Sequence, residues 1–128
     1  MILVIDASNR DQVKLGLLSK NKVLWHKFTV NYDFSQKLPL ELEKFLKKRK
    51  ISLKSLEKLA ISAGPGPFSH IRTVVASANA LAFGLDISIL PVIGPNPVFS
   101  WEKLQKIKSQ KTAMPFYERE PNITMPKV

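Results

Sequence analysis

The stretch LAISAGPGPFSHIR, residues 59–72, decides the fold of this chain. Residues 59–63 are a short apolar run of the kind that forms a buried strand. The turn that follows contains two glycines, which permit close backbone approach, and two prolines, which stiffen it and remove two amide donors. Beyond the turn, apolar residues recur at helical spacing, and Ser69 is predicted to cap the helix. The residues of this loop motif are Gly64, Pro65, Gly66 and Phe68.

The predicted helix carries a second face made of small side chains. Ala76, Ala80 and Gly84 recur every four residues, and Thr73 and Ser77 flank them. Small residues at this spacing let a second helix approach closely. Periodicity alone leaves two alternatives open, a contact with another protein and tight packing on the chain's own sheet.

The elements around this unit predict a mixed α/β fold. Three apolar strands joined by short turns open the chain and indicate an antiparallel meander. A helix, a strand, the small-residue helix and a last strand follow, and a strand–helix–strand unit of this kind makes a right-handed parallel crossover. The predicted strands are residues 1–5, 13–17, 23–30, 59–63 and 87–92, and the first helix starts at Ser35 or at the Leu38–Pro39 step and ends near Lys50.

This order of elements is that of a ribonuclease-H-like domain with a five-stranded sheet. The GPNP run at residues 94–97 cannot continue a strand or a helix interior, so we place a boundary there. Residues 1–94 are predicted to form the ribonuclease-H-like lobe. Residues 95–128 are predicted to hold one short amphipathic helix, around residues 98–108, and an extended proline-containing tail.

Composition narrows the class of protein further. The chain has 128 residues, 45% of them hydrophobic, which suits one folded domain with a real core. It has no cysteine, so disulfides and thiolate sites are excluded. The first residues lead straight into a strand, and no apolar run approaches membrane-spanning length, so we expect a cytoplasmic protein without a membrane partner. The net charge of +10 favours a polyanionic partner such as RNA, or an acidic protein surface.

Few residues have the pattern of a catalytic or metal site. His26 and His70 lie far apart, and neither has a second ligand at helical spacing, so no metal site is predicted. Asp6 ends the first strand where a ribonuclease-H-like nuclease needs a carboxylate, but residues 59–63 supply no second one. The turn at residues 64–67 precedes a helix N-terminus, which favours anions, yet two of its residues lack an amide hydrogen. We therefore predict no cofactor and at most weak nucleotide binding.

Three motifs resemble the TsaB family, also known as YeaZ or glycoprotease-like. The opening ILVIDAS, residues 2–8, is similar to the family's ILAIDTS, and residues 60–72 are similar to VGxGPGSFTGLR before an alanine-rich helix. Residues 117–124, YEREPNIT, resemble the family's C-terminal YLREPNIT. The chain departs from these patterns at Ala7, Pro67, Ser69 and His70. It also looks like a family member that lacks most of the second lobe.

The resemblance implies a non-catalytic scaffold with an actin-like ATPase fold. TsaB pairs with TsaD, a TsaE ATPase joins that pair, and TsaD transfers a threonylcarbamoyl group to adenosine in tRNA. The helix after the glycine turn is then the surface that contacts a TsaD-like subunit, or a second copy in a homodimer, and tRNA is met only through the complex. The implied contact residues are Arg72, Thr73, Ala76, Ser77, Ala80 and Gly84. The alternatives are a basic RNA-binding module and a nuclease- or peptidase-like enzyme.

Overall fold

A computed structural model describes residues 1–115 of the chain. Five strands form one sheet in the order β3-β2-β1-β4-β5. The first three pair antiparallel, and β4 and β5 extend the sheet in parallel from β1. The predicted meander and parallel crossovers are therefore confirmed. The strands are β1 (Ile2–Asp6), β2 (Gln12–Ser19), β3 (Lys22–Thr29), β4 (Lys58–Gly64) and β5 (Ser88–Ile93).

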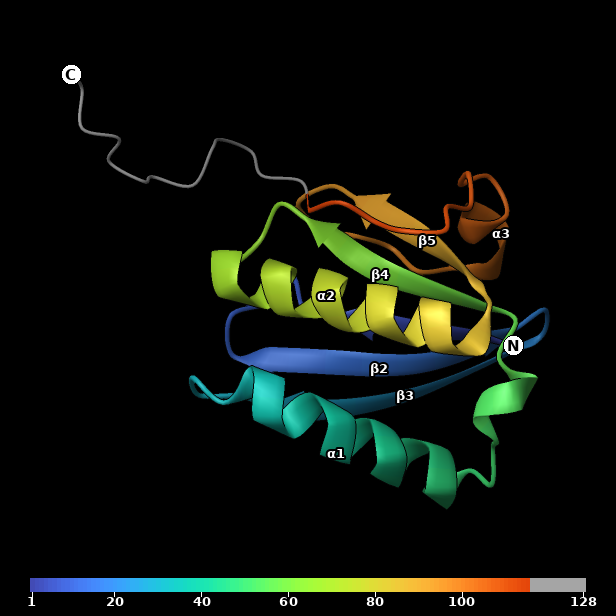
Figure 1. Ribbon diagram of the computed structural model, residues 1–128, viewed down its shortest axis with the longest axis horizontal. Coiled ribbons are helices and arrows are strands. Elements are labelled where there is room, and N and C mark those ends of the chain that lie inside the picture. Colours follow the sequence, from blue (N-terminus) through green and yellow to red (C-terminus); the bar gives the residue numbers. More distant parts are fainter. Residues whose placement is uncertain (116–128) are drawn as a thin grey trace.

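Two long helices cover one face of the sheet (Figure 1). They are α1 (Phe34–Lys48) and α2 (Phe68–Leu85), and a 3₁₀ turn, η1 (Leu53–Ser55), lies between α1 and β4. Alternate side chains of β1 and β2, such as Leu3 and Leu15, point toward these helices and are fully buried there. This larger core is what fixes α2 against β4.

A smaller apolar cluster lies on the opposite face of the sheet. Val4, Ala60 and Leu90 meet Phe99 and Leu104 there. Leu104 belongs to α3 (Trp101–Leu104), which Figure 1 shows beyond β5, away from α1 and α2. The short helix expected near residues 98–108 is thus confirmed in kind but spans a single turn.

Two helix starts differ from the sequence predictions. Ser69 does not cap α2, because the helix begins at Phe68 and Pro67 occupies the cap position without any side-chain hydrogen bond. The fixed φ of proline, here −55°, already directs the chain into the helix, and the Pro67 carbonyl accepts the Ile71 N–H at 3.0 Å. The first helix begins at Phe34, one residue before Ser35, and continues through Pro39.

Three further sequence predictions concern membrane-spanning segments, the C-terminal motif and the division of the chain into two parts. In the described part of the chain, no helix is both long and apolar enough to span a bilayer. The motif at residues 117–124 lies outside the described residues, so its prediction stands as made. The division of the chain at residues 94 and 95 also stays a prediction.

Candidate functional site

The turn between β4 and α2 sets where the helix starts. Gly64 ends β4 with φ of 114°, a conformation that favours glycine, and its carbonyl accepts the Gly94 N–H at 2.9 Å. A Cβ placed at Gly66 would lie 3.2 Å from Cδ1 of Ile71 and 3.5 Å from Cα of Ser8. The peptide bond between Gly64 and Pro65 is cis. The loop motif therefore brings the start of α2 against the turn that follows β1.

Helix α2 divides into a buried stripe and an outward face. Its core side includes Ile71, Val74 and Ala78, each fully buried. The small residues predicted as a contact face lie on the other side, where Ala76, Ala80 and Gly84 are exposed. A Cβ added at Gly84 would meet no atom within 4 Å. The sequence left open whether this face packs on the chain's own sheet, and within residues 1–115 it does not.

The other predicted contact residues border this face. Arg72 is exposed, and its guanidinium lies 5.4 Å from the centroid of the Phe68 ring. An arginine over an aromatic ring at this distance makes a cation–π contact. Thr73 and Ser77 are half-buried along the side of the same face. The six predicted residues thus occupy one continuous side of α2, with Arg72 near its N-terminal end.

Sequence reasoning missed the largest apolar group on this side of the helix. Phe83 is 90% exposed, and it follows Ala76 by seven residues, two helical turns. The helical spacing that places Phe83 outside the buried stripe also places it on the outward face, so the sequence contained the signal. A phenylalanine left in water beside small side chains is the kind of residue that anchors protein contacts.

A segment from the end of the described chain lies along the flank of α2. Asn79 donates its amide to the Ala113 carbonyl at 3.1 Å and accepts the Ala113 N–H at 2.7 Å. Gln110 forms an isolated antiparallel bridge with Ile89 on β5. Residues 110–113 are therefore held between the edge of the sheet and α2, and they leave the outward face uncovered.

The two histidines lie in separate places. Nε2 of His26 is 2.8 Å from Oε2 of Glu41, which joins β3 to α1, and the ring stacks on Phe45. His70 is buried beside Phe34, and its Nδ1 has no hydrogen-bond partner. His70 lies in the first turn of α2 and packs against Phe34 at the start of α1. Among residues 1–115 no three His, Asp or Glu side chains are grouped closely enough to hold a metal ion.

A polar cavity of about 360 Å³ lies near the end of β1. Asp6, the carboxylate singled out from the sequence, lines it and accepts hydrogen bonds from the N–H and O–H of Ser8. The other lining residues come from the turn between β1 and β2, from β2 itself and from the loop after β5, and they are Ser8, Asn9, Gln12, Lys14, Asn96, Pro97 and Val98.

Comparisons with known proteins agree with this architecture. Residues 29–94, just over half of the chain, match the model of the family TsaD, described as tRNA N6-adenosine threonylcarbamoyltransferase. The structure is similar to YeaZ from Pseudomonas aeruginosa, with a TM-score of 0.67 and 25% identity. It is equally similar, at 0.67 and 25%, to an uncharacterised protein described as similar to peptidase YeaZ from Pseudomonas aeruginosa. Comparison with curated proteins gave no significant match.

The structural matches cover a larger share of this chain than of the two solved structures. Each covers 72% of this chain but only 43% and 42% of the two solved structures, so the chain spans less than half of their length. The predicted α/β class and the resemblance stated from the sequence are both confirmed at this level.

Proposed function

Because this chain belongs to the TsaD family of tRNA N6-adenosine threonylcarbamoyltransferases and is TsaB-like, we propose that it is a non-catalytic scaffold subunit in threonylcarbamoyl modification of tRNA. In this proposal it pairs with a TsaD-like catalytic subunit through the outward face of α2. A TsaE-like ATPase joins the pair, and the chain contacts tRNA as part of this complex.

The observation that carries the proposal is the outward face of α2. Ala76, Ala80 and Gly84 form a shallow track, and Phe83 stands beside it with 90% of its surface exposed. A track of small residues permits a close helix–helix approach, and burial of one phenylalanine contributes about 1.5–3 kcal/mol to association. Ala76, Ala80, Gly84 and Phe83 carry no polar side-chain group, so this surface suits binding rather than chemistry.

The test is formation of a complex with the TsaD-like subunit of the same organism. Light scattering coupled to size-exclusion chromatography should give a one-to-one complex for the wild-type chain. Ala80→Arg places a long charged side chain on the track without touching the core, because position 80 is exposed. We expect this variant to elute separately from the partner while its thermal unfolding is unchanged.

A matched control introduces an arginine at an exposed position on a different helix. Leu40 is 61% exposed on α1, so Leu40→Arg introduces the same charge away from the proposed interface and should leave the complex intact. If Ala80→Arg pairs as well as the wild type, the face of α2 is not the contact. If the wild-type chain and the partner never elute together, the scaffold role itself is wrong.

A further inference from the structure

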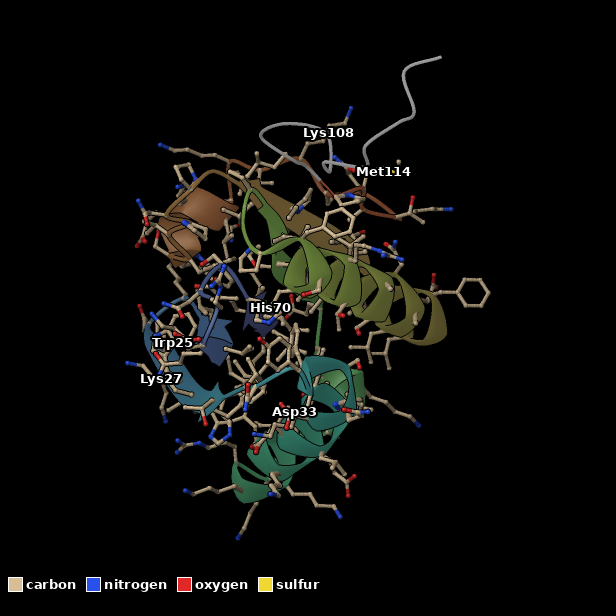
Figure 2. The ribbon with its side chains drawn as sticks, turned by 90° about the vertical axis from the view of Figure 1, so that its left-hand side faces the viewer. Trp25, Lys27, Asp33, His70, Lys108 and Met114 are labelled. Carbon is tan, nitrogen blue, oxygen red and sulfur yellow. The ribbon has the colours of Figure 1, made fainter. Side chains whose placement is uncertain are left out.

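The face of the sheet opposite to α1 and α2 presents an aromatic ring beside a pair of lysines. In the antiparallel register Gly16 lies opposite Trp25, and Lys14 lies opposite Lys27. Because paired residues point to the same side and side chains alternate along a strand, all four share one face. Figure 2 shows Trp25 and Lys27 on the side of the sheet away from the two long helices.

Trp25 is placed as a flat platform. A Cβ built on Gly16 would lie only 2.6 Å from Cζ3 of Trp25, so the indole ring rests directly on the glycine. Trp25 as a whole residue remains 38% exposed, and its neighbour Val23 is 46% exposed. One side of the indole is thus supported by the strand, and part of its surface stays available to water.

The lysines beside this platform repel each other. In residues 1–115 neither Lys14 nor Lys27 forms an ion pair, although like charges directly opposite each other on a sheet repel. Asp6 lies opposite Lys14 on β1, and its carboxylate, whose Oδ1 accepts both hydrogen bonds from Ser8, offsets part of the charge of Lys14 without forming an ion pair with it. A bound anion would relieve this repulsion.

The same row of side chains opens into the polar cavity near the end of β1. Lys14 belongs both to the lysine pair and to the cavity wall, where Gln12 and Asn96 add amide groups. An aromatic platform, adjacent cations and nearby amides are the groups that bind an unstacked base, its phosphates and its hydrogen-bonding edge.

We propose that the outer face of β2 and β3 binds single-stranded RNA, with one base stacked on Trp25 and its phosphates on Lys14 and Lys27. The charge of the face selects a polyanion, and the exposed ring selects an unpaired base rather than a duplex. The choice of RNA over DNA rests on the proposed function. The site lies on the opposite side of the sheet from the face of α2, so one chain can present both.

The experiment measures binding of a labelled short oligouridylate to the full chain alone, by fluorescence anisotropy over a range of salt. Trp25→Ala should weaken binding about 5- to 150-fold, and Trp25→Phe should restore most of it, because stacking needs an aromatic face. Lys14→Gln with Lys27→Gln should flatten the slope of log affinity against log salt by about 1.4, or about 0.7 per phosphate. In a Trp101→Phe background, RNA should quench the remaining emission of Trp25.

The matched control removes two other exposed lysines, Lys44→Gln with Lys48→Gln on α1, and should leave the affinity within about twofold because α1 covers the opposite face of the sheet from the site. The proposal is overturned if the oligonucleotide does not bind at low salt, or if Trp25→Ala binds like the wild type. Equal competition by duplex RNA overturns the stacked base, and stronger competition by single-stranded DNA overturns the choice of RNA.

This result is separable from that of the scaffold proposal. Ala80→Arg should lose the TsaD-like partner and keep the RNA affinity, whereas Trp25→Ala should do the reverse. Failure of one measurement therefore leaves the other proposal standing.

Discussion

Asp33 is one of only 10 acidic residues in a chain that has 20 lysines and arginines, and it stands directly before α1. Its Oδ1 accepts the Asn31 N–H at 2.9 Å, and its Oδ2 lies 3.5 Å from Nζ of Lys37. The backbone hydrogen bond first, and then the charge of Lys37, hold the pKa of Asp33 below its ordinary value of 3.8.

This shift predicts an acid-sensitive contribution to folding. Since the pKa is lower in the folded than in the unfolded chain, the contribution is present above pH 3.8 and is lost as the pH falls through the folded pKa. Asp33→Asn removes the titrating group. The wild type should therefore be more stable than this variant in urea at about pH 6, and the difference should shrink toward about pH 2.5. A difference that stays constant over this range would contradict the assignment.

Single residues also mark the limit of prediction from sequence. Ser69 has the chemistry of a helix cap, but the proline two positions earlier had already fixed the backbone. His70 lies in the first turn of α2, and it is buried against Phe34, which comes from a different helix. Local sequence describes what a residue can do, whereas its partner is chosen by the tertiary fold.

Among the elements, α2 was predicted most completely. Its buried stripe and its small-residue face both follow from a repeat of 3.6 residues, which the sequence displays directly. The last described segment shows the opposite case. Residues 110–113 form no regular element, and their place depends on Asn79, which is 34 positions away from Ala113. A contact of this kind leaves no periodic signal.

Asn79 should therefore make a measurable contribution to stability. Asn79→Ala leaves the N–H and the carbonyl of Ala113 without partners in a residue that is only 2% exposed. We expect the free energy of unfolding to fall by about 1–3 kcal/mol, measured by urea denaturation. Gln110→Ala is the control, because Gln110 bonds to Ile89 only through its backbone. Equal stability of the two variants would show that the amide of Asn79 is dispensable.

At the scale of the whole molecule, the outward face of α2 and the net charge of the chain have opposite effects on self-association. Phe83 and its small neighbours favour association of two copies, whereas a net charge of +10 opposes it. Salt screens the charge and leaves the apolar contact intact. The chain without its partner should therefore self-associate more strongly at high salt.

Sedimentation over a range of protein concentrations measures this balance. Phe83→Ser should shift the population toward monomer at every salt concentration, because it removes exposed apolar area without opening the core. If the wild type sediments as a monomer throughout, the homodimer alternative is wrong and the face is selective for a different partner. If both proteins associate alike, the contact lies elsewhere.

The edge of the sheet at β5 has a consequence for how copies of this chain behave while they are concentrated or newly made. The N–H and carbonyl of Ile89 are occupied by Gln110, and Pro91, in the same strand, has no N–H to offer. A strand from a neighbouring copy would find few groups there with which to continue the hydrogen-bond ladder. Growth of the sheet from chain to chain, the first step toward fibrils, is thus disfavoured at this edge, which leaves β3, at the other end of the sheet, as the edge where such growth can begin.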